Sequence, residues 1–333
     1  MDQRRHDLES LVGLSRDGDR RSLARLLSLV ESQDAAVAQI TGLTNERPTA
    51  HVVGITGPPG AGKSTSTSAL TAEFRRSGRR VGILAVDPSS PFSGGAVLGD
   101  RVRMQRHAHD GDVYIRSLAT RGHLGGLSVS TSHAIRLLEH ARFDIVIVET
   151  VGVGQSEVDI TTLADTTIVL LAPGLGDSVQ AAKAGILEIG DIFVVNKADR
   201  DGAEAVRRDL RNMIHLNDYV PEDWKPPICM TVAPRNEGLD DLCTRLDEHW
   251  TWLTTSGSIV ERRRRRAANE VRSLANAEIR RRWDQPDARE LLGRVAHDVA
   301  AKGKDPFRAM AEFLSGSLNC PPPIPGGRDS GYE

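Results

Sequence analysis

The chain has 333 residues, of which 39% are hydrophobic and 26% are charged, as is usual for a globular protein. Its formal net charge is −2 and only 4% of its residues are aromatic, so neither overall charge nor stacking rings favour nucleic-acid binding. No apolar run reaches the roughly 18 residues that a membrane helix needs, and the first residues lack the apolar core of a secretion signal.

The beginning of the chain predicts a small helical segment. Apolar residues recur there at helical spacing: Leu8, Leu11, Val12, Leu23, Leu26, Leu27 and Val30. Turn-forming residues between Asn45 and Pro48 end this pattern. We therefore expect an N-terminal helical part over residues 1–48.

Residues 49–255 predict an α/β domain. Short apolar and β-branched runs recur at Val52–Thr56, Val81–Val86, Phe143–Glu149, Thr166–Ala172, Ile192–Asn196 and Ile228–Val232. Longer amphipathic stretches separate most of these runs. This alternation is typical of a mostly parallel sheet whose strands are joined by crossover helices.

Residues 256–318 predict a second helical region. Its apolar residues form three helical stripes: Val271, Leu274, Ala275, Ile279 and Trp283; Leu291, Leu292, Val295 and Val299; Phe307, Met310, Phe313 and Leu314. Five consecutive arginines, Arg262–Arg266, would point around all sides of a helix that also carries acids, so we expect a solvated or dimer-facing arm. The Pro/Gly-rich residues 319–333 predict a disordered tail.

The segment from Gly57 to Ser64 matches the phosphate-loop motif GxxxxGK[ST] in full. It follows a predicted strand and opens a predicted helix, as this motif requires. Its amides would wrap the β-phosphate, Lys63 would reach the β- and γ-phosphate oxygens, and the Ser64 hydroxyl would bind Mg²⁺. The expected phosphate-binding residues are Gly57, Pro59, Gly60, Ala61, Gly62, Lys63, Ser64 and Thr65.

A buried strand that ends in an acid predicts the second part of the site. P-loop enzymes place such an acid beside Mg²⁺, directly or through water, and a glycine amide near the γ-phosphate. Here the acid is Glu149, in place of the commoner aspartate, and the glycine is Gly152.

The tetrapeptide NKAD, residues 196–199, predicts that the base is guanine. One carboxylate, that of Asp199, can accept both the N1–H and the N2–H₂ donors of guanine, whereas adenine offers no such pair. Asn196 can bond the base and the nearby loop, and the stem of Lys197 can lie over the ring. A later strand leads into the loop expected to meet the guanine O6: Val232, Ala233 and Pro234.

Further segments carry a family resemblance: Val86–Gly95, Leu98–Arg101, Arg121–Ser128, Glu149–Glu157 and Pro173–Asp177 with Gln180 and Lys183. Over about residues 10–320 the chain resembles the MeaB/ArgK-type GTPases. These are the G-protein metallochaperones of adenosylcobalamin-dependent methylmalonyl-CoA mutase. The resemblance implies a P-loop NTPase fold with helical extensions at both ends, and a homodimer held partly by the C-terminal helices.

The resemblance also implies roles for single residues. Mg²⁺ ligation would involve Ser64, Asp87, Asp100 and Glu149. Gln180 and Lys183 match a mobile switch that couples the partner to hydrolysis in the family. Together with Lys63 and Glu149, these two residues form the expected catalytic set.

Three functional hypotheses remain at this point. The leading one is a Mg²⁺-dependent GTP hydrolase that gates adenosylcobalamin loading and protection of the mutase. A kinase that transfers the γ-phosphate is the second, although no HRD-like loop is visible. The third is an RNA-linked GTPase that would use the arginine run. Cys229, Cys243 and Cys320 are odd in number and lack the spacing of a metal site, so we expect a reducing cytoplasm. The balanced charge, the few aromatic residues and the short apolar runs lead us to expect neither nucleic acid nor membrane as partner.

Overall fold

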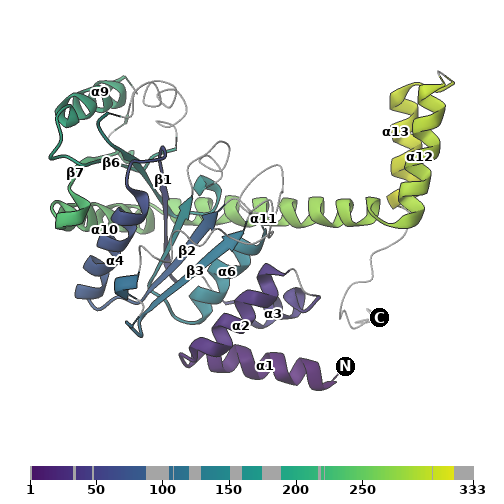
Figure 1. The fold of residues 1–333 in the computed structure, drawn as a ribbon, viewed down its shortest axis with the longest axis horizontal. Coiled ribbons are helices and arrows are strands. Elements are labelled where there is room, and N and C mark those ends of the chain that lie inside the picture. Colours follow the sequence, from purple (N-terminus) through teal and green to yellow (C-terminus); the bar gives the residue numbers. More distant parts are fainter. Residues whose placement is uncertain are drawn as a thin grey trace. The chain divides into compact units, whose positions relative to one another are not determined.

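The computed structural model describes residues 2–32, 35–46, 49–87, 105–107, 109–119, 129–150, 160–174, 189–216, 219–220, 222–301 and 303–318. Contacts divide the chain into two compact units, Met1–Arg266 and Ala267–Glu333 (Figure 1). The four-part division expected from the sequence stays a prediction.

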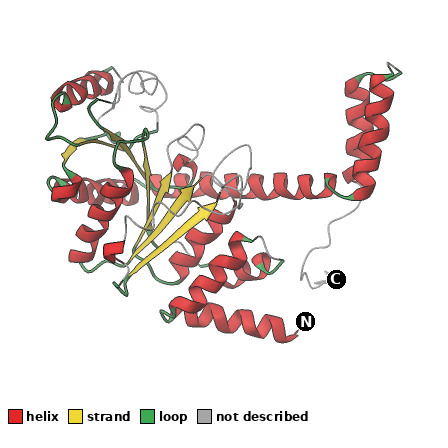
Figure 2. Cartoon of the chain, in the orientation of Figure 1, coloured by secondary structure: helices red, strands yellow, loops and turns green. Residues whose placement is uncertain are grey.

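In the part of the chain that the structure describes, seven strands form one sheet in the order β3-β2-β4-β1-β5-β6-β7 (Figure 2). The strands are β1 (His51–Thr56), β2 (Val81–Asp87), β3 (Val113–Ala119), β4 (Ile145–Thr150), β5 (Thr166–Leu171), β6 (Ile192–Asn196) and β7 (Ile228–Thr231). Every neighbouring pair is parallel. All strands therefore end at one edge of the sheet, here called the carboxyl edge, and begin at the opposite amino edge. The predicted α/β fold is confirmed.

Strand β3 has no counterpart among the runs predicted from the sequence. Among the strands of the described residues it pairs only with β2, so it lies at the edge of the sheet. Arg116 and Ser117 interrupt its apolar residues, and the Arg116 guanidinium pairs with Glu31 of the N-terminal helices at 2.5 Å. Edge strands tolerate such polar residues, which hides them from a search for apolar runs.

Helices cover both faces of the sheet. The helices that the structure describes are α1 (Asp2–Arg16), α2 (Arg20–Glu31), α3 (Val37–Leu43), α4 (Lys63–Arg76), α6 (Val129–His140), α9 (Ala203–His215), α10 (Leu239–Thr255), α11 (Ser258–Trp283), α12 (Pro286–Ala300) and α13 (Pro306–Leu318). Alternate strand residues face opposite layers: Ile168 and Leu170 share a core with α4 and α10, whereas Val169 and Leu171 pack with α9.

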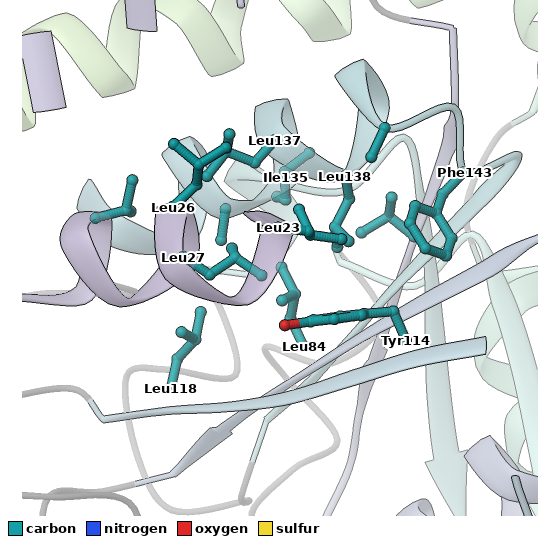
Figure 3. Packing of buried hydrophobic residues seen from close by; sticks show 14 of the residues in the cluster. Leu23, Leu26, Leu27, Leu84, Tyr114, Leu118, Ile135, Leu137, Leu138 and Phe143 are labelled. Atoms are coloured by element: carbon teal, nitrogen blue, oxygen red, sulfur yellow. The ribbon is translucent and has the colours of Figure 1, made fainter. Parts of the chain in front are cut away.

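The N-terminal helices extend the core on the face covered by α6. Asp19 caps α2 by accepting a hydrogen bond from the Ser22 amide at 2.7 Å. The predicted stripe of α2 is buried and points towards α6 and the strands: Leu23, Leu26, Leu27 and Val30. Figure 3 shows the first three of these against Ile135, Leu137 and Leu138 of α6, with Leu84, Tyr114 and Phe143 close by.

The second unit has a small core of its own. Helices α12 and α13 bury Ala288, Val295, Ala309 and Phe313 between them. The rings of Trp283 and Phe313 lie 5.6 Å apart. Several residues of the predicted stripes stay exposed: Val271, Leu274, Leu292, Phe307 and Met310.

Candidate functional site

The phosphate loop joins β1 to α4 at the carboxyl edge of the sheet. Gly57 and Gly62 have φ angles of +142° and +97°, which other residues rarely adopt. A Cβ at Gly57 would overlap the Leu170 carbonyl, and one at Gly62 would meet the Asn196 side chain. The glycines of the motif are thus required by close packing as well as by backbone angle.

Lys63 begins α4 and folds back over the loop. Its Nζ donates to the carbonyls of Gly57 at 2.7 Å and Pro58 at 3.3 Å. The side chain is buried. A helix N-terminus with aligned amides attracts anions, and the lysine adds a full positive charge there. This is the arrangement that a nucleotide's phosphates need.

Two of the predicted metal ligands, Ser64 and Glu149, are in direct contact. The Ser64 hydroxyl donates to Glu149 Oε1 at 2.6 Å, and Glu149 is only 2% exposed. Glu149 reaches this place because β4 lies between β2 and β1, pairing Glu149 with Ala85 and Ile55. Hydroxyl and carboxylate oxygens suit Mg²⁺, so the two residues fit a metal site.

The NKAD segment is bonded to the phosphate loop. Asn196 Nδ2 donates to the Ala61 carbonyl at 2.8 Å, and Lys197 Nζ donates to the Gly60 carbonyl at 2.6 Å. Asn196 Oδ1 accepts from Thr231 Oγ1, at the end of β7, at 3.2 Å and from the Ala233 amide, just after this strand, at 3.3 Å. The structure therefore joins three segments that are far apart in the sequence.

Asp199 is bound by a residue that the sequence did not single out. The Arg235 guanidinium donates to Asp199 Oδ2 at 2.8 Å, reaching it from the short helix η3 (Ala233–Arg235) that follows β7. The predicted O6 loop thus does lie beside the NKAD turn. Pairing across neighbouring strands is invisible in a single motif, and only the parallel order of β6 and β7 could have suggested it.

Several predicted site residues cannot be placed. Asp100, Gly152, Gln180 and Lys183 lie outside the described residues, as does the side chain of Asp87, although Asp87 does end β2. Among the residues that are described, no group of three or more His, Cys, Asp or Glu side chains could hold a metal ion. None of the helices formed by these residues is long and apolar enough to cross a membrane.

Only part of the arginine run is solvated as expected, namely Arg264 and Arg265. Three of its members bind the amino edge of the sheet: Arg262, Arg263 and Arg266. Arg262 donates to both oxygens of Asp191 at 2.8 and 2.6 Å. Arg263 lies 3.4 Å from Asp165. We call these three arginines and two aspartates the arginine clamp.

The aspartates of the clamp also hold the backbone. Asp165 accepts from the Val52 amide at 3.0 Å, and Asp191 accepts from the Thr167 amide at 2.8 Å. Each of these aspartates directly precedes a strand. An aspartate also stands directly before β3 and β4, so its repeated position in the sequence could have indicated a structural role. Each carboxylate therefore has a backbone amide and a guanidinium as partners at the same time.

Two buried histidines complete the amino edge. His51 Nε2 and His249 Nδ1 contact Thr166 Oγ1 at 2.6 and 2.8 Å. Burial lowers the pKa of each histidine to about 4, so both are neutral at pH 7. The Trp250 ring stacks on His51 with 4.5 Å between centroids.

Comparison with known proteins decides the family. The model of the family described as methylmalonyl Co-A mutase-associated GTPase MeaB matches residues 23–287. The chain belongs to the MeaB family. Membership, together with relatives named as GTPases, makes it a GTP hydrolase.

Two relatives and one solved structure match this MeaB-family chain over most of their length. A protein of Pyrococcus abyssi that is named as a GTPase is 43% identical, covering 94% of this chain and 98% of the relative. The mitochondrial methylmalonic aciduria type A homolog of Mus musculus is 32% identical, covering 89% of this chain and 76% of the homolog. The crystal structure of an LAO/AO transport system kinase is 26% identical with a TM-score of 0.70, covering 94% of this chain and 98% of the kinase chain. The fold is thus that of a P-loop NTPase with helical extensions.

Proposed function

We propose that this GTPase binds GTP with Mg²⁺ at the carboxyl edge of its sheet. The contact of Ser64 with the buried Glu149, at 2.6 Å, carries the proposal because it sets two oxygen ligands beside the phosphate loop. Mg²⁺ would supply positive charge to the phosphoryl group that is transferred to water. Asp87 and Asp100 would complete the metal site, and Lys63 would bind the phosphates.

Guanine recognition belongs to the same proposal. Asp199 would accept the two guanine donors, Lys197 would lie along the ring, and Asn196 would hold the NKAD turn against the phosphate loop, as its bond to the Ala61 carbonyl supports. The loop expected at O6 is Val232, Ala233 and Pro234, and the amide expected at the γ-phosphate is that of Gly152.

We further propose that the protein is a chaperone of methylmalonyl-CoA mutase, or of a related adenosylcobalamin-dependent acyl-CoA mutase, in the cytoplasm. The family description names that mutase, and the mouse relative is named for methylmalonic aciduria. GTP hydrolysis would gate loading of adenosylcobalamin and protect the mutase. A homodimer through the C-terminal helices would cover their exposed apolar residues, of which Phe307 is 80% exposed.

The test is GTP turnover with and without purified methylmalonyl-CoA mutase. We expect the mutase to accelerate hydrolysis and to bind with an affinity that depends on the nucleotide, because linkage is reciprocal. Lys183→Ala and Gln180→Ala should lower the stimulated rate more than the basal rate. Lys225→Ala, an exposed lysine outside the site, is the control. A mutase that neither binds nor stimulates would remove the chaperone role and leave the GTPase.

A second candidate is transfer of the γ-phosphate to a protein acceptor. One observation favours it, since the solved structure at TM-score 0.70 is titled as a transport system kinase. Incubation with γ-labelled GTP separates the two functions. Label recovered only as inorganic phosphate supports the hydrolase, whereas label on a protein supports the kinase.

A further inference from the structure

The loop that carries Arg235 is built to hold this arginine beside the NKAD turn. The amide and carbonyl of Val232 bond with Glu237 at 3.1 and 3.4 Å, which closes the loop. Asn236 has a φ of +57° and Gly238 one of +71°, and a Cβ at Gly238 would overlap the Met230 carbonyl. The backbone on either side of Arg235 is therefore tightly constrained.

The same loop is bonded to the turn that carries Asp199. The Ala198 amide donates to the Thr231 carbonyl at 3.0 Å. The Ala233 amide donates to Asn196 Oδ1 at 3.3 Å. These bonds fix the distance between the two backbones, so the 2.8 Å contact of Arg235 with Asp199 Oδ2 follows from the fold.

Stability alone does not explain this ion pair. The Arg235 and Asp199 side chains are 57% and 34% exposed. Ion pairs at such exposure contribute little to folding, because water screens the charges and two side chains lose freedom. The carboxylate that is held is, however, the one proposed to recognise guanine.

We propose that Arg235 is a positioning residue for guanine recognition. This inference rests on the proposed role of Asp199. Each carboxylate oxygen has two lone pairs, so Oδ2 can accept from Arg235 and from one guanine donor while Oδ1 accepts the other. The guanidinium fixes the Asp199 rotamer before the base arrives, which lowers the entropy cost of binding.

The experiment measures GDP and xanthosine diphosphate affinity by titration calorimetry. Asp199→Asn should weaken GDP binding and strengthen binding of xanthosine diphosphate, whose C2 carbonyl suits an amide donor. Arg235→Ala should weaken GDP binding about fivefold to tenfold, in the range expected when one side chain must be ordered on binding. Arg235→Lys should restore part of the loss, since it keeps the charge without the planar fork.

The double variant separates positioning from a merely structural role. If Arg235 acts through the carboxylate, adding Arg235→Ala to Asp199→Asn should weaken xanthosine diphosphate binding less than Arg235→Ala alone weakens GDP binding, because a neutral amide oxygen accepts a weaker bond from the guanidinium. A loop that had simply lost its shape would instead weaken both nucleotides equally. Arg207→Ala removes an exposed arginine that pairs with Glu204 on α9, and it serves as the matched control.

Each outcome has one meaning. If Asp199→Asn leaves GDP affinity unchanged, the guanine assignment falls and the role of Arg235 falls with it. If Asp199→Asn weakens GDP binding but Arg235→Ala does not, or tightens it, only the positioning role is overturned. An equal loss in both backgrounds also overturns it.

Discussion

The same strands carry charged groups at both of their ends, and the two ends differ in what those groups bind. At the carboxyl edge, Lys63 and Lys197 donate to carbonyls of the phosphate loop, beside the first turn of α4. At the amino edge, Arg262 and Arg263 face aspartates that already accept backbone amides. One edge collects amides and cations around a loop, and the other matches each cation with an anion.

This difference shows that positive charge alone does not identify a phosphate site. Five consecutive arginines attract attention in the sequence, yet three of them bind groups at the amino edge of the sheet. A single lysine in a glycine-rich loop is the better indicator, because the backbone around it presents amides to an anion.

The largest effect is expected from Lys63→Ala, which tests whether the carboxyl edge binds the phosphates. Without the lysine, the phosphates lose their nearest cation, and we expect GDP affinity to fall on the order of a hundredfold or more. The urea midpoint should change little. Titration calorimetry and urea unfolding of the same preparation measure both quantities. Affinity close to that of the unmodified protein would remove Lys63 from the site.

The opposite pattern is expected at the amino edge. Arg262→Ala leaves Asp191 without its bidentate partner, and we expect a loss of about 2–4 kcal/mol in the free energy of unfolding with GDP affinity retained. Tryptophan fluorescence reports on this edge, since the Trp224 indole donates to the Asp191 carbonyl at 2.8 Å.

A matched control lies two residues further along the same helix. Arg264 pairs with Glu261 and is 77% exposed. Arg264→Ala should therefore cost no more than about 0.5 kcal/mol. If Arg262→Ala and Arg264→Ala unfold at the same urea concentration, the clamp does not stabilise the fold.

A smaller effect concerns pH. Burial raises the pKa of Glu139 to about 7, and the Arg266 guanidinium 3.9 Å away only partly opposes this. The native state then holds a proton that the unfolded state has lost, so this contribution to stability disappears as pH rises through 7. His51 and His249 act in the opposite sense, because their lowered pKa values remove stability as pH falls from about 6.5 towards 4.

These three groups together predict a stability maximum near neutral pH. Between pH 6 and pH 8 the loss from Glu139 and the gain from the two histidines nearly cancel in the unmodified protein. Glu139→Gln removes only the loss, so its stability should rise by about 1 kcal/mol relative to the unmodified protein over this range. Urea midpoints measured across this pH range test it. An identical pH dependence of the two midpoints would show that Glu139 does not titrate there.

The sequence predicted the fold well because the fold depends on local patterns, and the same kind of pattern places the phosphate loop and NKAD at the ends of strands. Apolar runs predicted six of the strands, and fixed spacing predicted the phosphate loop and NKAD. The bonds of the arginine clamp join residues that are 71 or more positions apart in the sequence. Arg235 and Asp199 are 36 positions apart. No spacing rule connects such pairs, because only the order of the strands brings them together.

The most direct test of this division between the two edges is a crystal structure with Mg²⁺ and a non-hydrolysable GTP analogue. We expect the guanine edge on the Asp199 carboxylate, the phosphates on residues 57–64, and Mg²⁺ at Ser64 and Glu149. The clamp at Arg262 and Asp191 should be unchanged. A base bound away from Asp199, or phosphates bound by the arginines of the clamp, would contradict the account.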